Sequence, residues 1–192
     1  MRELTDLRRE LRERRRRLTP NQRVTAALAV TEHLRALPGW PQARRVAGYW
    51  AVRGELPLLG LLAALPAEAR YCLPVLRDDQ TLHFAPWQPG AAIAPNRFGI
   101  PEPADTAQAL PPECMDVVVL PLLGFTRCGA RIGTGGGWYD RSFAFRKAAP
   151  APPLLVGVAY ACQQLDDDWT PRPWDVPLDA IATERELIVC TR

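Results

Sequence analysis

The start of the chain has its apolar residues at helical spacing. One face of a helix would carry Leu4, Leu7, Leu11 and Leu18, and Glu10 and Arg14 could pair one turn apart on another side. A second helix is predicted to begin after Thr19, because Thr19-Pro20-Asn21-Gln22 supplies an N-cap, a proline at the first helical position and a capping-box glutamine. This helix should end before Pro38-Gly39.

From residue 46 the pattern changes to short apolar runs separated by turn residues, which predicts strands. The runs are 46–50, 70–75, 82–87, 117–123, 154–160, 180–182 and 187–190, with helical segments at 57–65 and about 137–147. Continuous apolar strands that alternate with helices predict a mainly parallel sheet covered on both faces. We therefore expect an α/β fold of three layers, in which helices flank the sheet and a helical pair precedes it, built as a single domain over residues 1–192.

Composition places the chain among ordinary globular proteins. Its 192 residues are 47% hydrophobic and 23% charged, and the net charge is +3. No stretch approaches the roughly 18 apolar residues of a membrane span, and the N-terminus is rich in arginine where a signal peptide would be apolar. We expect a cytoplasmic monomer that binds neither membrane nor nucleic acid.

The five cysteines are widely spaced and include no Cys-x-x-Cys pair, so a zinc site or a disulfide framework is not expected. Small buried apolar side chains are the simpler interpretation. Ser142 is the only serine, and it follows Asp140 by two residues in a predicted helix, which argues against a Ser/His/Asp triad.

A glycine-rich segment follows the apolar run 117–123. Residues 133–137 contain four glycines, preceded by Arg131 and followed by Trp138, Tyr139 and Asp140. Such a backbone can bring its N–H groups close to an anion, and Arg131 and a helix beginning near Gly137 would add donors. Asp140 would repel a bare phosphate unless a divalent cation lay between them, so the pattern favours a magnesium–nucleotide complex.

A plain tight turn is the alternative interpretation of these glycines. Two familiar phosphate motifs are excluded: the segment has no Gly-Lys-Ser/Thr, and Trp138 stands where the dinucleotide fingerprint starting at Gly133 needs its last glycine. If the segment binds a ligand, the site should lie outside the carboxyl ends of the strands.

Several segments together resemble the 5-formyltetrahydrofolate cyclo-ligase family, also called methenyltetrahydrofolate synthetases, along almost the whole chain. They are the arginine-bearing first helix, Gly54-Glu55-Leu56, the stretch from Asn96 to Pro103, Leu120-Pro121, the stretch from Gly129 to Arg141, Gly157-Val158-Ala159 with Gln163, and Asp175 with Asp179. The resemblance implies an ATP- and Mg²⁺-dependent cyclisation of 5-formyltetrahydrofolate to 5,10-methenyltetrahydrofolate, with release of ADP and phosphate, through a phosphorylated formyl (iminium phosphate) intermediate.

The resemblance also implies roles for particular residues. ATP would be bound by Arg8, Arg131, Gly133, Thr134, Gly135, Gly136, Gly137, Trp138 and Tyr139, and Mg²⁺ by Asp140 and Asp175. Trp50, Glu55, Trp138 and Tyr139 would contact the folate, and Arg131 and Tyr139 would be catalytic. The chain departs from the family pattern at Leu4, where a lysine is usual, and at Trp174, where many relatives have a histidine.

Local alternatives exist for some of these residues. Trp50 could be a core residue, and Glu55 could cap a helix that starts near Pro57. Asp175 could serve only in an Asx turn.

Two other functions remain open on residues alone. The arginine-rich first helix could bind a polyanion, although Glu10 and Glu13 dilute its charge. A sugar-phosphate isomerase or an acyl transferase could use a similar α/β scaffold, and it would not need a nucleotide.

Overall fold

A seven-stranded sheet lies at the centre of the computed structural model, which describes residues 3–149, 151–166 and 169–190. Its strand order is β11-β10-β9-β6-β1-β2-β3. The strands are β1 (Arg45–Ala47), β2 (Arg70–Leu76), β3 (Leu82–Pro86), β6 (Val117–Pro121), β9 (Leu154–Val158), β10 (Ala180–Ala182) and β11 (Leu187–Val189). Each one overlaps a predicted apolar run, so the prediction of these strands is confirmed, although β1 shares only residues 46 and 47 with the run 46–50.

The strands from β10 through β9, β6 and β1 to β2 are parallel, and the edge strands β3 and β11 are antiparallel to their neighbours. The residues of β6 are buried from Val117 to Leu120, as expected for a central strand covered on both sides. The predicted mainly parallel sheet is therefore confirmed.

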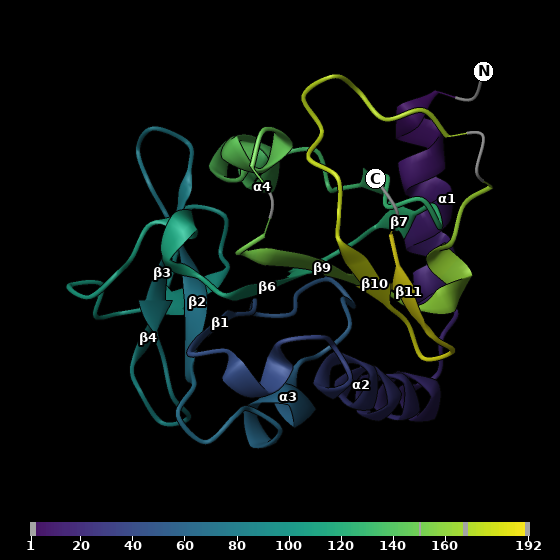
Figure 1. The fold of residues 1–192 in the computed structure, drawn as a ribbon. Coiled ribbons are helices and arrows are strands. Elements are labelled where there is room, and N and C mark those ends of the chain that lie inside the picture. The colour runs from purple at the N-terminus through teal and green to yellow at the C-terminus, as the bar shows by residue number, and fades with distance from the viewer. Residues whose placement is uncertain (1–2, 150, 167–168, 191–192) are drawn as a thin grey trace.

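Helices cover both faces of this sheet (Figure 1). On one face lie α2 (Pro20–Arg35) and α3 (Leu59–Ala63), and on the other lies α4 (Trp138–Ser142). The two faces bury separate hydrophobic clusters, one that contains Val30 of α2 and one that contains Phe143 at the end of α4. The fold is the predicted three-layer α/β arrangement.

The two N-terminal helices follow the predicted order but pack against different clusters. In α1 (Leu4–Arg16), Leu7 and Leu11 pack with Leu123 and Ile132 beside the sheet. The predicted Glu10–Arg14 pair is present at 2.7 Å. The helix α2 begins with the complete predicted capping box between Thr19 and Gln22.

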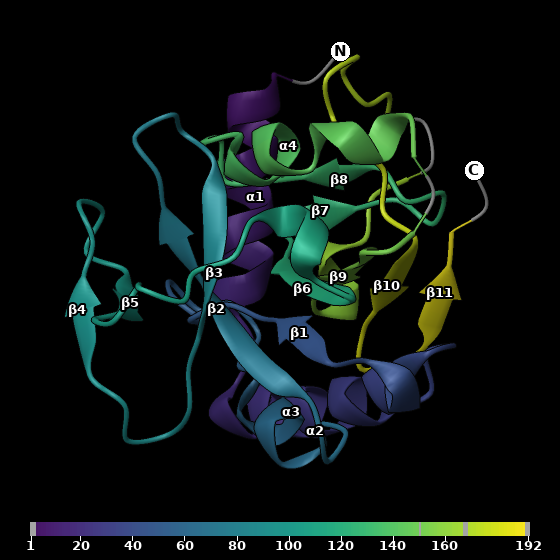
Figure 2. The same ribbon diagram turned by 60° about the vertical axis from the view of Figure 1, so that its left-hand side comes forward.

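Short elements were predicted less well. The segment predicted as a helix over about 137–147 consists of α4 and a separate 3₁₀ turn, η3 (Ala144–Lys147), because Phe143 leaves helical geometry at φ −110° and ψ 19°. Two small hairpins were not predicted. They pair β4 (Ile93–Pro95) with β5 (Pro101–Pro103) and β7 (Gly124–Phe125) with β8 (Arg131–Ile132). Figure 2 shows the β4–β5 hairpin at the side of the molecule. The remaining 3₁₀ turns are η1 (Trp40–Gln42), η2 (Pro112–Cys114) and η4 (Ala161–Gln163).

None of the helices in the described part of the chain is long and apolar enough to cross a membrane. All five cysteines are free thiols, which agrees with the expected absence of a disulfide framework. Cys72 and Cys190 are buried as expected, but Cys128 is exposed. Cys114 and Cys162 are only partly buried. The expectation that every cysteine is a small buried side chain is therefore wrong for Cys128, which lies in the turn between β7 and β8, and only partly met by Cys114 and Cys162.

Candidate functional site

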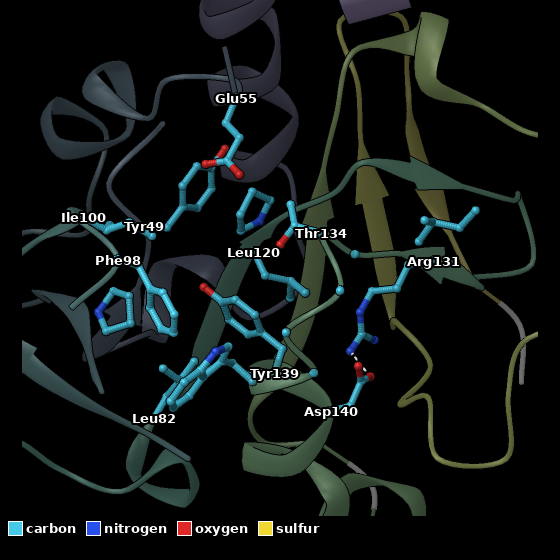
Figure 3. A pocket seen from close by; sticks show the side chains of 18 of the residues that line it. Tyr49, Glu55, Leu82, Phe98, Ile100, Leu120, Arg131, Thr134, Tyr139 and Asp140 are labelled. Atoms are coloured by element: carbon cyan, nitrogen blue, oxygen red, sulfur yellow. Dashed lines mark hydrogen bonds and ion pairs between the residues drawn. The ribbon is translucent and has the colours of Figure 1, made fainter. Parts of the chain in front are cut away.

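One pocket of about 430 Å³ opens at the carboxyl ends of the parallel strands. Its walls come from the segment after β1, from β2, from the end of β6, from the β4–β5 loop and from the glycine-rich segment (Figure 3). The location agrees with the one predicted for a ligand of an open α/β sheet. Every predicted site residue lines this pocket, including Arg8, Trp50, Glu55 and Asp175, which are far apart in the sequence.

The glycine-rich segment joins β8 to α4, and its backbone conformation depends on glycine. Gly135 has φ +114° and Gly137 has φ +65°, in the region that residues with a Cβ rarely adopt. In the described structure, no N–H group from Gly133 to Gly137 donates a hydrogen bond to a protein acceptor. These amides are available to an anion, which favours the ligand loop over a plain turn. The helix after them has only five residues, so its dipole contributes less than the predicted longer helix would.

Arg131 is buried and already has protein partners. One terminal nitrogen forms an ion pair with Asp140 Oδ1, and the other donates to the carbonyl oxygen of Val176. Asp140 Oδ1 also accepts the N–H of Val176 at 3.1 Å. Burial lowers the pKa of Arg131, and the nearby carboxylates of Asp140 and Asp175 oppose that shift. The expected open fork of donors is thus committed to Asp140 and Val176, and Arg131 links β8 to α4 and to the backbone at Val176.

Asp140 and Asp175 are the two acidic residues beside this segment. Asp175 Oδ2 accepts the N–H of Arg172 at 2.8 Å, three residues before it. An Asx turn would join the carboxylate to the N–H two residues after it, so the expected Asx turn is not the bond that Asp175 makes while it lines the pocket. Within the described chain, each of the two carboxylates keeps one oxygen without a protein donor. The described residues include no cluster of three or more His, Cys, Asp and Glu. Two carboxylates next to an anion loop fit Mg²⁺, which is commonly held by one or two carboxylates together with phosphate oxygens.

One arginine contacts the glycine-rich loop, and a second lies near it and lines the same pocket. Arg8 of α1 donates its Nε–H to the carbonyl oxygen of Gly133 at 3.0 Å, so the predicted approach of the first helix to this loop is present. Arg172 lines the same pocket. The pKa of Arg8 is lowered mainly by burial and, to a smaller extent, by the positive charge of Arg172. Sequence reasoning missed Arg172, because a single arginine in a proline-rich loop carries no recognisable pattern.

The opposite half of the pocket is aromatic and includes the carboxylates of Glu55 and Glu102. Glu55 and Tyr139 point into it from opposite sides (Figure 3). Glu55 Oε2 accepts the N–H of Val52 at 3.1 Å, and α3 has no side-chain cap, so the helix-capping interpretation of Glu55 is wrong. Burial raises the pKa of Glu55, although the Val52 N–H and the charges of Arg15 and Arg53 oppose the shift.

Aromatic side chains line the junction between the two halves. Tyr139 stacks on Phe143 with 6.2 Å between ring centroids, and Trp138 meets Phe98 edge to face at 6.0 Å. Burial raises the pKa of Tyr139, with a smaller contribution from the charge of Glu55, so its phenol is protonated at neutral pH. Trp50 is half-buried against Trp87 and lines the pocket, so it is both a packing residue and a wall residue.

Ser142 has a structural role. Its buried hydroxyl donates to the carbonyl oxygen of Trp138 at 2.7 Å and accepts the N–H of Leu82 at 2.8 Å. The bond from Leu82 connects α4 to β3, and the bond to Trp138 lies within α4. Both uses of the hydroxyl agree with the expectation that Ser142 is no triad nucleophile.

Some arginines of the first helix are engaged within the protein. Arg14 pairs with Glu10, Arg15 is buried and donates to the carbonyl oxygen of Arg53 at 2.7 Å, and Arg8 donates to Gly133. The exposed arginines Arg9, Arg16 and Arg17 form surface ion pairs with Asp6 or Glu13. These acidic partners dilute the positive charge of the helix, which disfavours the polyanion-binding alternative.

The fold and the pocket define an α/β protein whose pocket has an anion subsite next to an aromatic subsite.

The model of the 5-formyltetrahydrofolate cyclo-ligase family matches residues 1–184, and the chain belongs to this family. The 5-formyltetrahydrofolate cyclo-ligase of Haemophilus influenzae is 36% identical over 176 residues, which cover 90% of this chain and 92% of that protein. The one from Escherichia coli K12 is 34% identical over 181 residues, which cover 92% and 98%.

Solved structures agree with this assignment. The NMR structure of Aquifex aeolicus 5,10-methenyltetrahydrofolate synthetase matches with a TM-score of 0.81 and 27% identity, and the match covers 98% of this chain and 93% of that one. The Mycoplasma pneumoniae 5,10-methenyltetrahydrofolate synthetase shares the fold, with a TM-score of 0.72 at 22% identity over 95% and 99% of the two chains.

Proposed function

We propose that this pocket converts 5-formyltetrahydrofolate to 5,10-methenyltetrahydrofolate with ATP as the co-substrate, releasing ADP and phosphate. The observation that carries the proposal is that a glycine-rich loop with unused N–H groups shares one pocket with an aromatic half that contains Glu55, in a chain that belongs to the cyclo-ligase family. A pocket of this composition accommodates a phosphate tail and a flat heterocycle side by side.

The reaction needs activation of the formyl group, because an amide oxygen is a poor leaving group at neutral pH. The formyl oxygen at N5 attacks the γ-phosphorus, the bond from that phosphorus to the ADP oxygen breaks, and an iminium phosphate forms. N10 then attacks the formyl carbon and loses its proton, and the C–O bond breaks as phosphate leaves. Phosphoryl transfer of this kind asks the protein mainly for positioning and charge neutralisation.

The glycine-rich half of the pocket would position the nucleotide and neutralise its charge. The amides from Gly133 to Gly137 would bind the ATP phosphates, and Arg8 would approach them from α1. Asp140 and Asp175 would hold Mg²⁺, which neutralises phosphate charge during transfer. Arg131 would contribute positive charge next to the phosphates and would orient Asp140 through their ion pair.

The aromatic half would hold the folate. Trp50 would lie against the pterin ring, and the Glu55 carboxylate would accept hydrogen bonds from pterin N–H groups. Trp138 and Tyr139 line the pocket and follow the glycine-rich loop directly in the sequence, so they would lie where the formyl oxygen and the γ-phosphate meet. The protonated phenol of Tyr139 would donate a hydrogen bond to the oxygen that accumulates charge in the transition state.

One assay tests the reaction directly. Purified protein is mixed with Mg-ATP and 5-formyltetrahydrofolate, and the methenyl chromophore is followed together with ADP. We expect methenyl product and ADP in equal amounts, and no product without ATP. ATP-independent product or the absence of any methenyl product would refute the proposal, and turnover of a sugar phosphate or an acyl donor without ATP would support the isomerase or transferase alternative. Monomeric state and cytoplasmic location stay predictions.

A further inference from the structure

An arginine stands on the aromatic rim of the pocket. The loop between β4 and β5 carries Arg97 and Phe98, and the ring of Phe98 is 50% exposed where it meets Trp138. The guanidinium carbon of Arg97 lies 5.4 Å from the centroid of Phe98 and 5.3 Å from that of Trp138. Both rings line the pocket, and Arg97 itself is exposed at its outer edge.

Side-chain hydrogen bonds fix the loop that carries Arg97. Asn96 Oδ1 accepts the N–H groups of Phe98 at 2.8 Å and Ile100 at 3.1 Å. Asn96 Nδ2 donates to Glu102 Oε1 at 2.7 Å, and the same oxygen accepts the N–H of Leu76 at 3.1 Å. This loop therefore has a defined position over the pocket, and the carboxylate nearest to it in sequence is engaged with Asn96 and β2.

The charge of Arg97 is not matched by an acidic side chain in the described structure. Contact with the two ring faces stabilises the cation but leaves guanidinium N–H donors for other acceptors. A second guanidinium, that of Arg141, lies 5.3 Å from the centroid of Trp138 and donates to the carbonyl oxygens of Gln80 at 2.8 Å and Gly136 at 2.9 Å. Two positive charges on one ring favour an anionic group at the rim.

We propose that Arg97 binds a carboxylate of the glutamate tail of the folate substrate. The inference rests on the proposed function, because that substrate has an apolar aromatic middle and ends in carboxylates. With the pterin at Glu55, the aromatic middle would lie along Phe98 and Trp138, and the tail would leave the pocket beneath Arg97. The positive charge of Arg141 adds to the field at this position, although its own donors are largely used.

Loss of the Arg97 contact should weaken folate binding equally in the ground state and in the transition state. An exposed charge-assisted hydrogen bond contributes a modest amount, so Arg97→Gln should raise the KM for 5-formyltetrahydrofolate by about three- to tenfold with little change in kcat. The KM for ATP should not change. The effect should shrink as salt concentration rises, because solvent screens the interaction.

The test compares three substrates: 5-formyltetrahydrofolate, its triglutamate form and the primary amide of 5-formyltetrahydropteroate (the pteroate form), which lacks glutamate and has no tail carboxylate. Wild-type protein should favour both glutamate-bearing substrates over the pteroate form. Arg97→Gln should lose most of that preference and use the pteroate form as well as wild type does, and Arg97→Lys should recover part of it. Arg185→Gln, in the exposed turn between β10 and β11 and outside the pocket lining, is the matched control and should behave as wild type.

The outcomes separate the two proposals. If wild type makes methenyl product but Arg97→Gln keeps the wild-type ratio of KM values between glutamate-bearing and glutamate-free substrates, the tail contact is refuted and the proposed function stands. If wild type makes no methenyl product with any of the three substrates, both proposals are refuted.

Discussion

The turn that presents Glu55 is held by a buried arginine, and replacing that arginine should weaken folate binding. Arg53 and Gly54 have φ values of +53° and +81°, and a positive φ is unfavourable at a non-glycine residue such as Arg53. The buried Arg15 of α1 donates from Nη2 to the carbonyl oxygen of Arg53 at 2.7 Å, and Arg23 of α2 donates from Nη1 to that of Gly54 at 2.9 Å. These bonds place Glu55 at the pocket wall.

Arg15→Met removes the charge and the donors but keeps most of the aliphatic stem. The lost charge-assisted hydrogen bond is worth about 1.5–3 kcal/mol. If the whole loss falls on the position of Glu55, the KM for 5-formyltetrahydrofolate rises about 10- to 150-fold. In the described structure Arg15 Nη1 is buried without a partner, so its removal offsets part of the loss in global stability. We therefore expect a small change in Tm beside a large change in folate KM.

Arg15→Met should also shift the pH dependence of kcat/KM for the folate. Burial raises the pKa of Glu55, and the charge of Arg15 is among the influences that oppose the rise. Loss of that charge raises the pKa further, so protonation of Glu55 begins at a higher pH. The acid limb of kcat/KM for the folate should therefore move to higher pH.

The assay is steady-state kinetics with each substrate varied in turn, from about pH 5 to pH 9. Arg16→Met, on an exposed position of the same helix, is the control for loss of one arginine. An Arg15→Met protein with wild-type folate KM and an unmoved acid limb would show that Arg15 does not position Glu55. A parallel rise in the KM for ATP would instead indicate general damage to α1.

Three other substitutions test the separate halves of the pocket. Glu55→Gln should raise the folate KM about tenfold or more while the KM for ATP stays the same, because a charged acceptor is lost; the reverse pattern in kinetics would place Glu55 in the nucleotide half. Asp140→Asn should raise the Mg²⁺ concentration needed for half-maximal activity, because an amide carries no charge; an unchanged magnesium titration would remove Asp140 from the metal site. Gly135→Ala should raise the KM for ATP about tenfold, because φ +114° costs a residue with a Cβ about 1–3 kcal/mol; wild-type kinetics would show that the loop conformation does not matter.

Much of the scaffold followed from local pattern. The apolar runs identified every strand of the central sheet, and the signal is clearest for the central strand β6, since a strand buried on both faces must be apolar throughout. The capping box identified the start of α2, because its hydrogen bonds join residues only three positions apart. The hairpins β4–β5 and β7–β8 were missed, because strands of two or three residues show no periodicity.

The sequence by itself determined the α/β class, the central strands and, through family resemblance, a set of residues that all line the candidate pocket. Only the tertiary structure decided how those residues are used. It commits Arg131 to Asp140 and Val176, buries Arg15 beneath the Glu55 turn and lays Arg97 over Trp138. The physical reason is that hydrophobic periodicity reports whether a position is buried, whereas the partner of a charged side chain depends on which distant segments the folded chain brings within hydrogen-bonding distance.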